Sequence, residues 1–171
     1  MAYSTIPKTK RDGIIYLKDG TTPTAISLQI AYEEGNLQFE PTKAGQTVIR
    51  DRGTITTIRK GDDEPAATGS FSAYFRQFTD TTPEAGSIID FINQTQQYAS
   101  NVSTGRTGTP YVEEYCIDIE YRVEGTDLGD STDQSATLSK CICTFSFAEG
   151  DPSSFSINFT CYGGVVYANP T

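Results

Sequence analysis

The chain has 171 residues, a length that fits one domain with a real hydrophobic core. Its 22 acidic and 13 basic residues give a net charge of −9, which argues against wrapping a nucleic-acid backbone, since that requires clustered lysine and arginine. The chain contains no histidine, so a Ser-His-Asp or Cys-His catalytic site is excluded and the commonest general base and metal ligand are missing.

The first twelve residues are polar and are expected to form a flexible arm. The basic residues of this arm are Lys8, Lys10 and Arg11. A short strand is expected over 13–18, ending at an Asp-Gly turn. Two further strands, over 24–33 and 37–40, are expected on either side of a Glu-Gly-Asn hairpin signal.

A pair of alternating strands, over 54–59 and 71–76, is expected next, because a period of two suits a half-buried strand. Residues 46–50 lead into this pair. Between the two strands lies GDDEPAATG, whose glycine, acids and proline are typical of an exposed turn. The sequence therefore predicts one strand pair with an acidic tip, formed by Asp62, Asp63 and Glu64.

A helix is expected over 83–99, because a proline and an acidic residue follow Thr82 at the positions that favour a helix start. Apolar residues then recur at helical spacing, and we interpret them as a stripe packed on the core rather than as a ligand site. The members of this stripe are Ile88, Ile89, Phe91, Ile92 and Thr95.

Three long strands are expected after the helix, over 111–123, 136–148 and 154–162. Gly163-Gly164 is then expected to release a C-terminal tail, residues 163–171. Together the elements predict a mainly β protein with one domain over 1–171. The expected architecture is an antiparallel β-sandwich or barrel of seven or eight strands with one flanking α-helix.

Three acidic residues of the strand over 111–123 share one face with Arg122, and this face has two interpretations. It is either an ordinary solvated face or a wall that repels something negative. Pairs of these acids could also serve a glycosidase, which needs two carboxylates ~5–10 Å apart in a cleft. The acids are Glu114, Asp118 and Glu120.

The remaining acidic and cysteine residues do not favour a metal site or a reactive site. The spacing of Asp127, Asp130 and Asp133 does not match a calcium-binding loop. We expect reduced core cysteines at 141, 143 and 161 and an exposed thiol at Cys116. A later bond between neighbouring strands, for example from Cys161 to Cys143, stays open. The expected protein is not an enzyme and has no cofactor and no metal.

The order and size of the elements resemble the major tail tube protein of long-tailed, non-contractile bacteriophages. The resemblance is most specific at Arg52-Gly53, in the turn Gly61-Asp62-Asp63-Glu64-Pro65 and at the strand start Ser70-Phe71-Ser72. It covers nearly the whole chain, but elsewhere it depends only on element order and size.

This resemblance implies a structural virion protein that forms hexameric rings, which stack into a tail tube for DNA ejection. It implies partners as well: other copies of the chain, tape measure, tail-tip and tail-terminator proteins, and DNA that passes without specific binding. The tube is then a negatively lined conduit, because carboxylates in the bore would repel phosphate, and Glu114, Asp118 and Glu120 become candidates for the lumen. Candidates for contacts between subunits or rings are the N-terminal arm, residues 37–53 and the C-terminal tail, including Lys8, Lys10, Arg11, Arg50, Arg52, Asp62, Asp63 and Glu64.

No stretch of the sequence approaches the ~20 apolar residues of a membrane helix, and the N-terminus lacks the apolar run of a secretory signal. We therefore expect assembly in the host cytoplasm without a membrane partner, and the resemblance implies a final location in the virion tail. The alternative from another class is a β-sandwich binding or decoration module of a virion that recognises carbohydrate or a surface protein.

Overall fold

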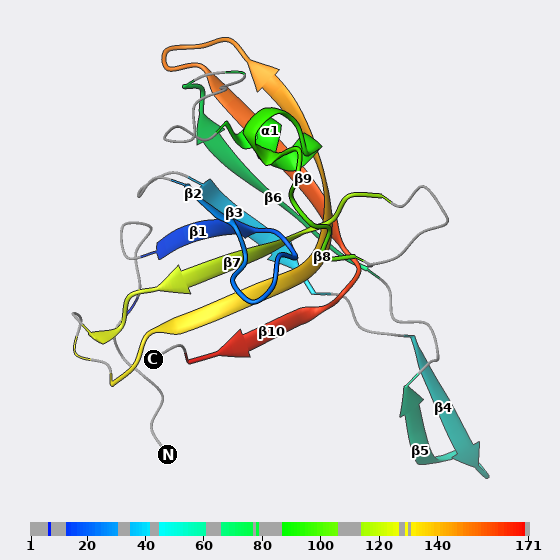
Figure 1. Ribbon diagram of the computed structural model, residues 1–171. Coiled ribbons are helices and arrows are strands. Elements are labelled where there is room, and N and C mark those ends of the chain that lie inside the picture. Colours follow the sequence, from blue (N-terminus) through cyan, green and yellow to red (C-terminus); the bar gives the residue numbers. More distant parts are fainter. Residues whose placement is uncertain are drawn as a thin grey trace.

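The structure is a computed structural model that describes residues 7, 13–30, 35–41, 45–60, 66–76, 78, 87–105, 114–126, 129 and 131–169. The elements of this part of the chain are mainly strands (Figure 1). They are β1 (Gly13–Lys18), β2 (Ser27–Ile30), β3 (Gly35–Glu40), β4 (Gln46–Asp51), β5 (Thr54–Lys60), β6 (Ala67–Tyr74), α1 (Ile88–Asn93), the 3-10 turn η2 (Gln96–Tyr98), β7 (Ile117–Val123), β8 (Gln134–Ala148), β9 (Ser154–Cys161) and β10 (Val165–Ala168).

Eight strands form one antiparallel sheet in the order β2-β1-β7-β8-β9-β6-β3, with β10 paired to β8 beside this path. The 15-residue strand β8 belongs to two parts of this sheet. Its first half pairs with β7 and β10, and its second half pairs with β9. Figure 1 shows β8 curving between the two parts, so the sheet folds over itself. We call this folded eight-stranded sheet, with α1 on its flank, the sandwich. The expected mainly β class with a helix on its flank is confirmed.

A β-bulge at Lys140 accounts for the bend in β8. Lys140 has a positive φ of 57°, and the register with β7 shifts there. Bulges of this kind kink a strand and let it change sheets. Leu138 and Cys141 are three residues apart, so strict alternation would put them on opposite faces, yet both are fully buried. The inserted residue turns both side chains into the core.

The core lies between the two parts of the sheet and under α1. Phe91 of α1 is fully buried and packs edge-on against Tyr98 of η2, with ring centroids 4.9 Å apart. Burial of large apolar side chains is the dominant favourable term in folding. The other largest buried apolar side chains are Leu17, Phe71, Ile117, Ile119, Leu138 and Ile157.

The helix is shorter than the predicted span 83–99. It ends at Asn93, because Gln94 adopts the left-handed conformation with φ 55° and ψ 49°. The backbone N–H and the hydroxyl of Thr95 donate to the backbone carbonyl and the carboxylate of Asp90, at 3.0 and 2.6 Å. This local hydrogen bonding competes with a further helical turn. Thr95 is exposed rather than part of the apolar stripe, and the predicted start at 83–86 lies outside the described residues.

The predicted pairing of the strand over 54–59 with the strand over 71–76 is wrong. Among the described residues β5 pairs with β4 alone, in a separate two-stranded sheet, while β6 pairs with β3 and β9. The turn that makes this hairpin is Arg52-Gly53, with φ of 46° and 88°. Two successive positive φ values are the signature of a type I′ hairpin turn. The predicted acidic tip over 61–65 lies outside the described residues.

The predicted free C-terminal tail is also wrong in its first part. β10 pairs with the first half of β8, with Val165 opposite Leu138. The strand predicted over 111–123 begins at Ile117, and 111–113 lie outside the described residues. Of the strand predicted over 24–33, the structure describes β2 and leaves 31–33 undescribed. Of the N-terminal arm it describes only Pro7.

Asp19 fixes the loop that follows β1. This residue is buried, and its carboxylate accepts hydrogen bonds from the backbone N–H groups of Thr21 (3.1 Å), Ile26 (2.6 Å) and Val102 (3.1 Å). Val102 follows α1 in the chain by nine residues, so one side chain ties two distant loops together. The sequence indicated only a turn at this position.

Candidate functional site

One face of the strands β3, β6, β9 and β8 is lined by hydroxyl and amide side chains. The register places these residues in rows that cross the sheet, because directly opposite residues share a face. In one row Gln38, Ser70, Asn158 and Thr144 lie side by side. The other rows are Glu40, Thr68, Thr160 and Ile142, and then Ser72, Ser156 and Ser146. We call these eleven residues the hydroxyl face.

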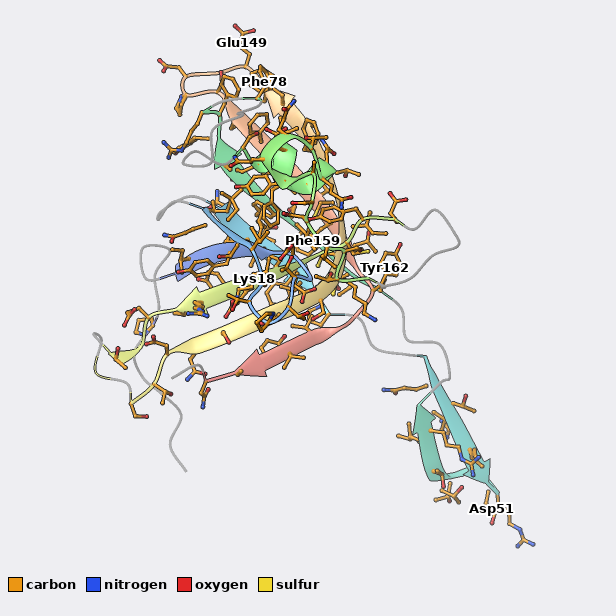
Figure 2. The ribbon with its side chains drawn as sticks, in the orientation of Figure 1. Lys18, Asp51, Phe78, Glu149, Phe159 and Tyr162 are labelled. Carbon is orange, nitrogen blue, oxygen red and sulfur yellow. The ribbon has the colours of Figure 1, made fainter. Side chains whose placement is uncertain are left out.

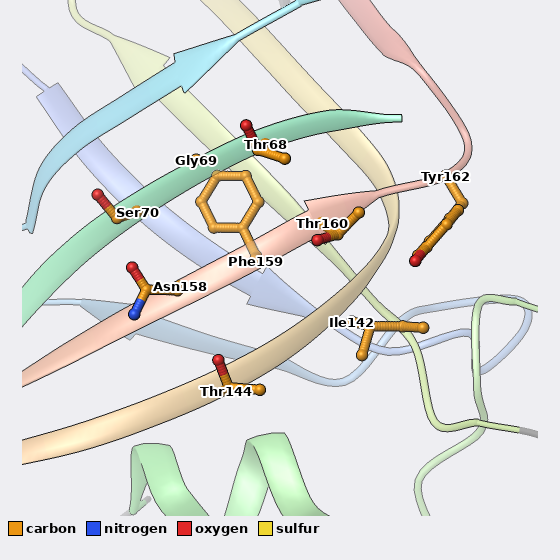
Figure 3. A pocket seen from close by; sticks show the side chains of 9 residues that line it. All are labelled: Thr68, Gly69, Ser70, Ile142, Thr144, Asn158, Phe159, Thr160 and Tyr162. Atoms are coloured by element: carbon orange, nitrogen blue, oxygen red, sulfur yellow. The ribbon is translucent and has the colours of Figure 1, made fainter. Parts of the chain in front are cut away.

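The hydroxyl face carries almost no charge, since Glu40 is its one ionisable residue. A shallow hollow of about 430 Å³ opens on it between β6, β9 and β8 (Figure 3). Tyr162 stands at one end of the hollow with most of its side chain exposed. The opposite face of the same strands is apolar: the ring of Phe159 lies so close to Gly69 that an added Cβ would be 2.3 Å from it.

The hairpin β4–β5 projects away from the sandwich, with Asp51 at its far end (Figure 2). Residues 46–59 are exposed throughout. The register puts Val48 opposite Ile58 and Arg50 opposite Ile55, so these four side chains share one face of the hairpin. Ile55 and Ile58 are 47% and 58% exposed, and Val48 and Ile49 are also exposed. A two-stranded hairpin with uncovered apolar side chains is marginally stable in water by itself.

Arg50 and Arg52 lie on this hairpin. The guanidinium of Arg50 donates to the carbonyl of Gly53 at 3.4 Å, and Arg52 occupies the turn itself. Both are exposed, as contact residues would be. The other predicted contact residues lie outside the described part of the chain: Lys8, Lys10, Arg11, Asp62, Asp63 and Glu64.

Glu120 is not an open acid on a solvated face. It is only 5% exposed and lies between two cations. Arg122 donates to its carboxylate at 2.8 Å, and Lys18 of the neighbouring strand β1 forms a second ion pair. Burial acts to raise the pKa of Glu120, but the hydrogen bonds and charges of Arg122 and Lys18 outweigh burial, so the pKa is lowered. The carboxylate is ionised and locally neutralised.

The other two predicted lumen acids occupy different positions. Asp118 is half-buried, and its carboxylate accepts a hydrogen bond from the backbone N–H of Lys140 at 2.9 Å, which holds the bulge of β8. Glu114 is exposed and precedes the strand rather than lying within it. The structure therefore does not place the three acids on one uniform acidic wall. A lumen role for them stays a prediction.

The cysteine predictions are confirmed in part. Cys141 and Cys161 are fully buried, Cys143 is half-buried, and all four cysteines are free. Cys116 is 7% exposed, so the expected exposed thiol is wrong, and burial raises the pKa of its thiol. The residue directly opposite Cys161 is Cys141, whereas Cys143 faces Phe159. The bulge at Lys140 leaves this register unchanged. The sequence alone could not show which cysteines lie opposite each other.

Within the described ranges, no three histidine, cysteine, aspartate or glutamate side chains are grouped so that they could hold a metal ion. Asp133 accepts hydrogen bonds from the backbone N–H groups of Gly125 (3.0 Å) and Thr126 (3.3 Å), while Asp127 and Asp130 lie outside those ranges. None of the helices in the described part of the chain has the length and apolar character needed to cross a membrane.

Sequence reasoning missed the hydroxyl face. Its signal was present in the alternation of serine and threonine with apolar residues in β6, β8 and β9. Acidic side chains were the candidates because carboxylates repel phosphate. Short uncharged side chains are typical of ordinary solvent-facing positions and indicate no function by themselves. The rows become visible only when the strand register is known.

No model of a known protein family matches the chain, and no curated protein matches it in sequence. Among solved structures, a chain of the cryo-EM structure of the anti-feeding prophage (AFP) baseplate, 6-fold symmetrised, has a similar fold. The TM-score is 0.55, the sequence identity is 7%, and the match covers 97% of this chain and 98% of that chain. The likeness extends over nearly the full length of both chains and shows that they share a fold.

Proposed function

We propose that the chain is the tube-forming subunit of a phage-tail-like particle. Six copies form a ring, and the rings stack into a tube through which DNA leaves. The tail is of the non-contractile type that the sequence resemblance implies, and the protein acts by assembly, without catalysis. The fold that it shares with a component of a six-fold symmetrised baseplate supports this proposal.

The observation that carries the proposal is the β4–β5 hairpin. Its apolar residues have no cover within the described part of the subunit, although an exposed apolar face of this kind marks an interaction site. A hairpin that reaches away from its own sandwich is suited to contact a neighbouring chain (Figure 1). Stacked rings supply such a neighbour at every level of the tube.

The hydroxyl face is the proposed wall of the channel. DNA is held by cations that displace its counterions, and this face presents neither lysine nor arginine. Six copies would contribute one carboxylate each, from Glu40, in a bore lined with hydroxyl and amide groups. Such a wall can be wetted by water and lets phosphates pass without binding them. We prefer it to the face of Glu120, whose charge is neutralised by its neighbours.

Negative-stain electron microscopy of the purified chain tests the proposal. We expect rings with six-fold symmetry, or tubes built from them, at high protein concentration. A variant in which Val48, Ile55 and Ile58 are all replaced by serine should keep the fold of the sandwich and lose the stacking of rings. A wild-type protein that stays monomeric at every concentration and salt condition would contradict the proposal.

A lysine placed on the hydroxyl face tests the channel wall. In assembled tubes, Asn158→Lys should create a band of cations in the bore and retain short double-stranded DNA at low salt, with release as salt is raised. Gln134→Lys, at the exposed start of β8, is the control and should retain less. Equal retention by both variants would show that the hydroxyl face does not line the bore.

A second candidate, the carbohydrate-binding module, is favoured by one observation. Tyr162 stands exposed beside hydroxyl and amide groups in the hollow, and aromatic rings of this kind can stack on a sugar. A stable monomer that binds immobilised glycans, with binding lost in Tyr162→Ala, would support it. Ring formation without glycan binding would reject it.

A further inference from the structure

Two of the four cysteines lie directly opposite each other on neighbouring strands of the large sheet. Cys141 of β8 faces Cys161 of β9, and both are fully buried. Cys141 also pairs with Ile117 of β7. It is the last residue of β8 that pairs with β7 and the first that pairs with β9. The two cysteines therefore lie where the two parts of the sheet meet, directly after the bulge at Lys140.

The backbone hydrogen bonds show that this position suits a disulfide. The N–H of Tyr162 donates to the carbonyl of Lys140 at 3.2 Å, so Cys141 and Cys161 form a non-hydrogen-bonded pair. In such pairs the Cα atoms are about 4.5 Å apart, and a disulfide spans Cα separations of about 4.4–6.8 Å. Cys143 is diagonal to Cys161, and diagonal neighbours are about 7–8 Å apart, which is beyond that span.

The carbonyl groups around the Cys161 sulfur do not depend on its proton. The sulfur lies 3.1 Å from the carbonyl oxygen of Ser139 and 3.2 Å from that of Gly164. The Ser139 carbonyl also accepts the N–H of Gly163 at 2.8 Å, and the Gly164 carbonyl accepts the N–H of Ser139 at 3.1 Å. Loss of the thiol proton therefore leaves neither carbonyl unpaired, so no desolvation penalty of this kind opposes a disulfide.

The two thiols also affect each other's ionisation. When Cys161 is ionised, the S–H of Cys141 donates to the thiolate and lowers the pKa of Cys161. The same hydrogen bond, together with burial, raises the pKa of Cys141. The thiolate is the form that attacks a disulfide bond. Cys161 is therefore suited to attack first, and Cys141 is suited to complete the exchange.

Strand β10 covers the Cys161 sulfur. Gly164, which contacts this sulfur, directly precedes β10, and Cys161 itself is only 1% exposed. In the described part of the chain β10 pairs with β8 alone, and three of its four residues are exposed. A short strand with exposed residues and one neighbour opens at a lower free energy than strands inside the sheet. Opening of β10 gives a small molecule a route to the thiol.

We propose that Cys141 and Cys161 are a redox site that takes a low-molecular-weight disulfide as oxidant. The Cys161 thiolate attacks one sulfur of the oxidant, forms a mixed disulfide and releases the first small thiolate. The Cys141 thiol then loses its proton and attacks the Cys161 sulfur, which releases the second. Two protein thiols are oxidised, one small disulfide is reduced to two thiols, and the new bond joins β8 to β9. This inference goes beyond the proposed function and does not need the ring.

Thiol counting at a controlled redox state tests the site. The wild-type chain is equilibrated with mixtures of reduced and oxidised glutathione, quenched in acid and alkylated in denaturant. Intact-mass spectrometry should find all four thiols under reducing conditions and two fewer under oxidising conditions. Peptide mapping should show that the bond joins Cys141 to Cys161. The oxidised chain should unfold at a higher urea concentration, because a cross-link restricts the unfolded chain.

Matched cysteine variants separate this pair from the other two thiols. Cys116→Ala and Cys143→Ala should each still lose two thiols on oxidation and keep the rise in urea midpoint. Cys161→Ala and Cys141→Ala should lose none and show no rise. Circular dichroism confirms that each variant is folded, and the wild-type measurement decides the question where a variant is not.

A pair of proline variants tests the route through β10. Val166 lies opposite Thr137, two residues along from the bonded residues Ser139 and Gly164, so by alternation its N–H points toward β8. Val166→Pro removes this donor and should speed the oxidation several-fold. In Tyr167→Pro the lost N–H points away from β8, so the rate should change less. Equal rates in both variants and the wild type would exclude the route through β10.

The outcomes keep this inference separate from the proposed function. Four free thiols in the wild type at every glutathione ratio would overturn the redox site, and so would a disulfide that contains Cys116 or Cys143. Neither result depends on ring formation, so the proposed function would stand. Absence of rings would contradict the proposed function and leave the redox site standing.

Discussion

The sandwich and the β4–β5 hairpin use similar strand sequences with opposite results. In β9, every second side chain from Phe155 to Cys161 is buried. In β4 all six residues are exposed, although Val48 and Ile49 are as apolar as many core residues. The difference teaches that apolar side chains in a strand indicate a surface that is buried in the functional state. They do not indicate whether the burying residues belong to the same chain. In the proposed tube, a neighbouring chain supplies the cover that the hairpin lacks.

Removal of the hairpin is expected to have the largest effect, which is on ring stacking. Replacing residues 46–60 with a short Gly-Ser linker should abolish ring stacking, because the surface proposed to contact the next ring is gone. The sandwich should unfold at nearly the same urea concentration, since in the described part of the chain β4 and β5 pair only with each other. Sedimentation velocity and urea titration measure the two effects. Intact tubes without the hairpin would show that it is dispensable.

A matched pair of Ile→Ala variants compares burial directly. Ile119→Ala, at a fully buried position of β7, should lower the free energy of unfolding by about 2–5 kcal/mol. Ile58→Ala in the hairpin should change it by less than about 0.5 kcal/mol in the monomer. Chemical denaturation at low protein concentration measures both. Equal losses would mean that the hairpin is covered within its own subunit.

The carboxylate of Asp19 holds two loops of the sandwich together, and its removal tests this anchoring role. Asp19→Ala leaves three partly buried backbone N–H groups without their acceptor and should cost about 2–3 kcal/mol. Asp151→Ala, in the exposed turn before β9, is the control and should have little effect. Amide hydrogen exchange should show the opening of the loops at 19–26 and 101–105. An unchanged unfolding midpoint in Asp19→Ala would exclude the anchoring role.

The smallest expected effect concerns Glu120 and pH. Its pKa is lowered in the folded state, so its contribution to stability is present above the unfolded value of about 4.3 and is lost as pH falls through the lower folded value. Because Lys18 and Arg122 are partly exposed, this contribution should be about 1 kcal/mol. Urea midpoints from pH 7 down to pH 3 should fall more steeply for the wild type than for Glu120→Gln. Parallel pH profiles would contradict the ion-pair role.

Much of the sandwich was predictable because alternation is local. The buried parity of Phe71 and Ala73, and of Phe155, Ile157 and Phe159, follows from side chains that point to opposite faces in turn. Alternation does not reveal where the backbone leaves its regular path. Lys140 adds a residue to β8, and Gln94 ends the helix in a left-handed conformation.

The candidate site was less predictable. Glu120 shares its strand face with Arg122 in the sequence, but Lys18 arrives from β1, about a hundred residues earlier, through the register of β1 with β7. The hydroxyl face needs four strands in register, and no single strand shows it. The partner of β5 could not be chosen from sequence, because β4 and β6 lie on either side of it and both are close in the chain.

By itself the sequence determined the strand class, the faces of most strands and the acidic, histidine-free composition that excludes a Ser-His-Asp or Cys-His site. These properties depend on neighbouring residues and on composition. Only the tertiary structure decided which strands pair, where β8 bends, which acid is neutralised and which cysteines lie opposite each other. Those outcomes depend on contacts between segments far apart in the chain, where small differences in packing free energy select one arrangement among several that local pattern allows.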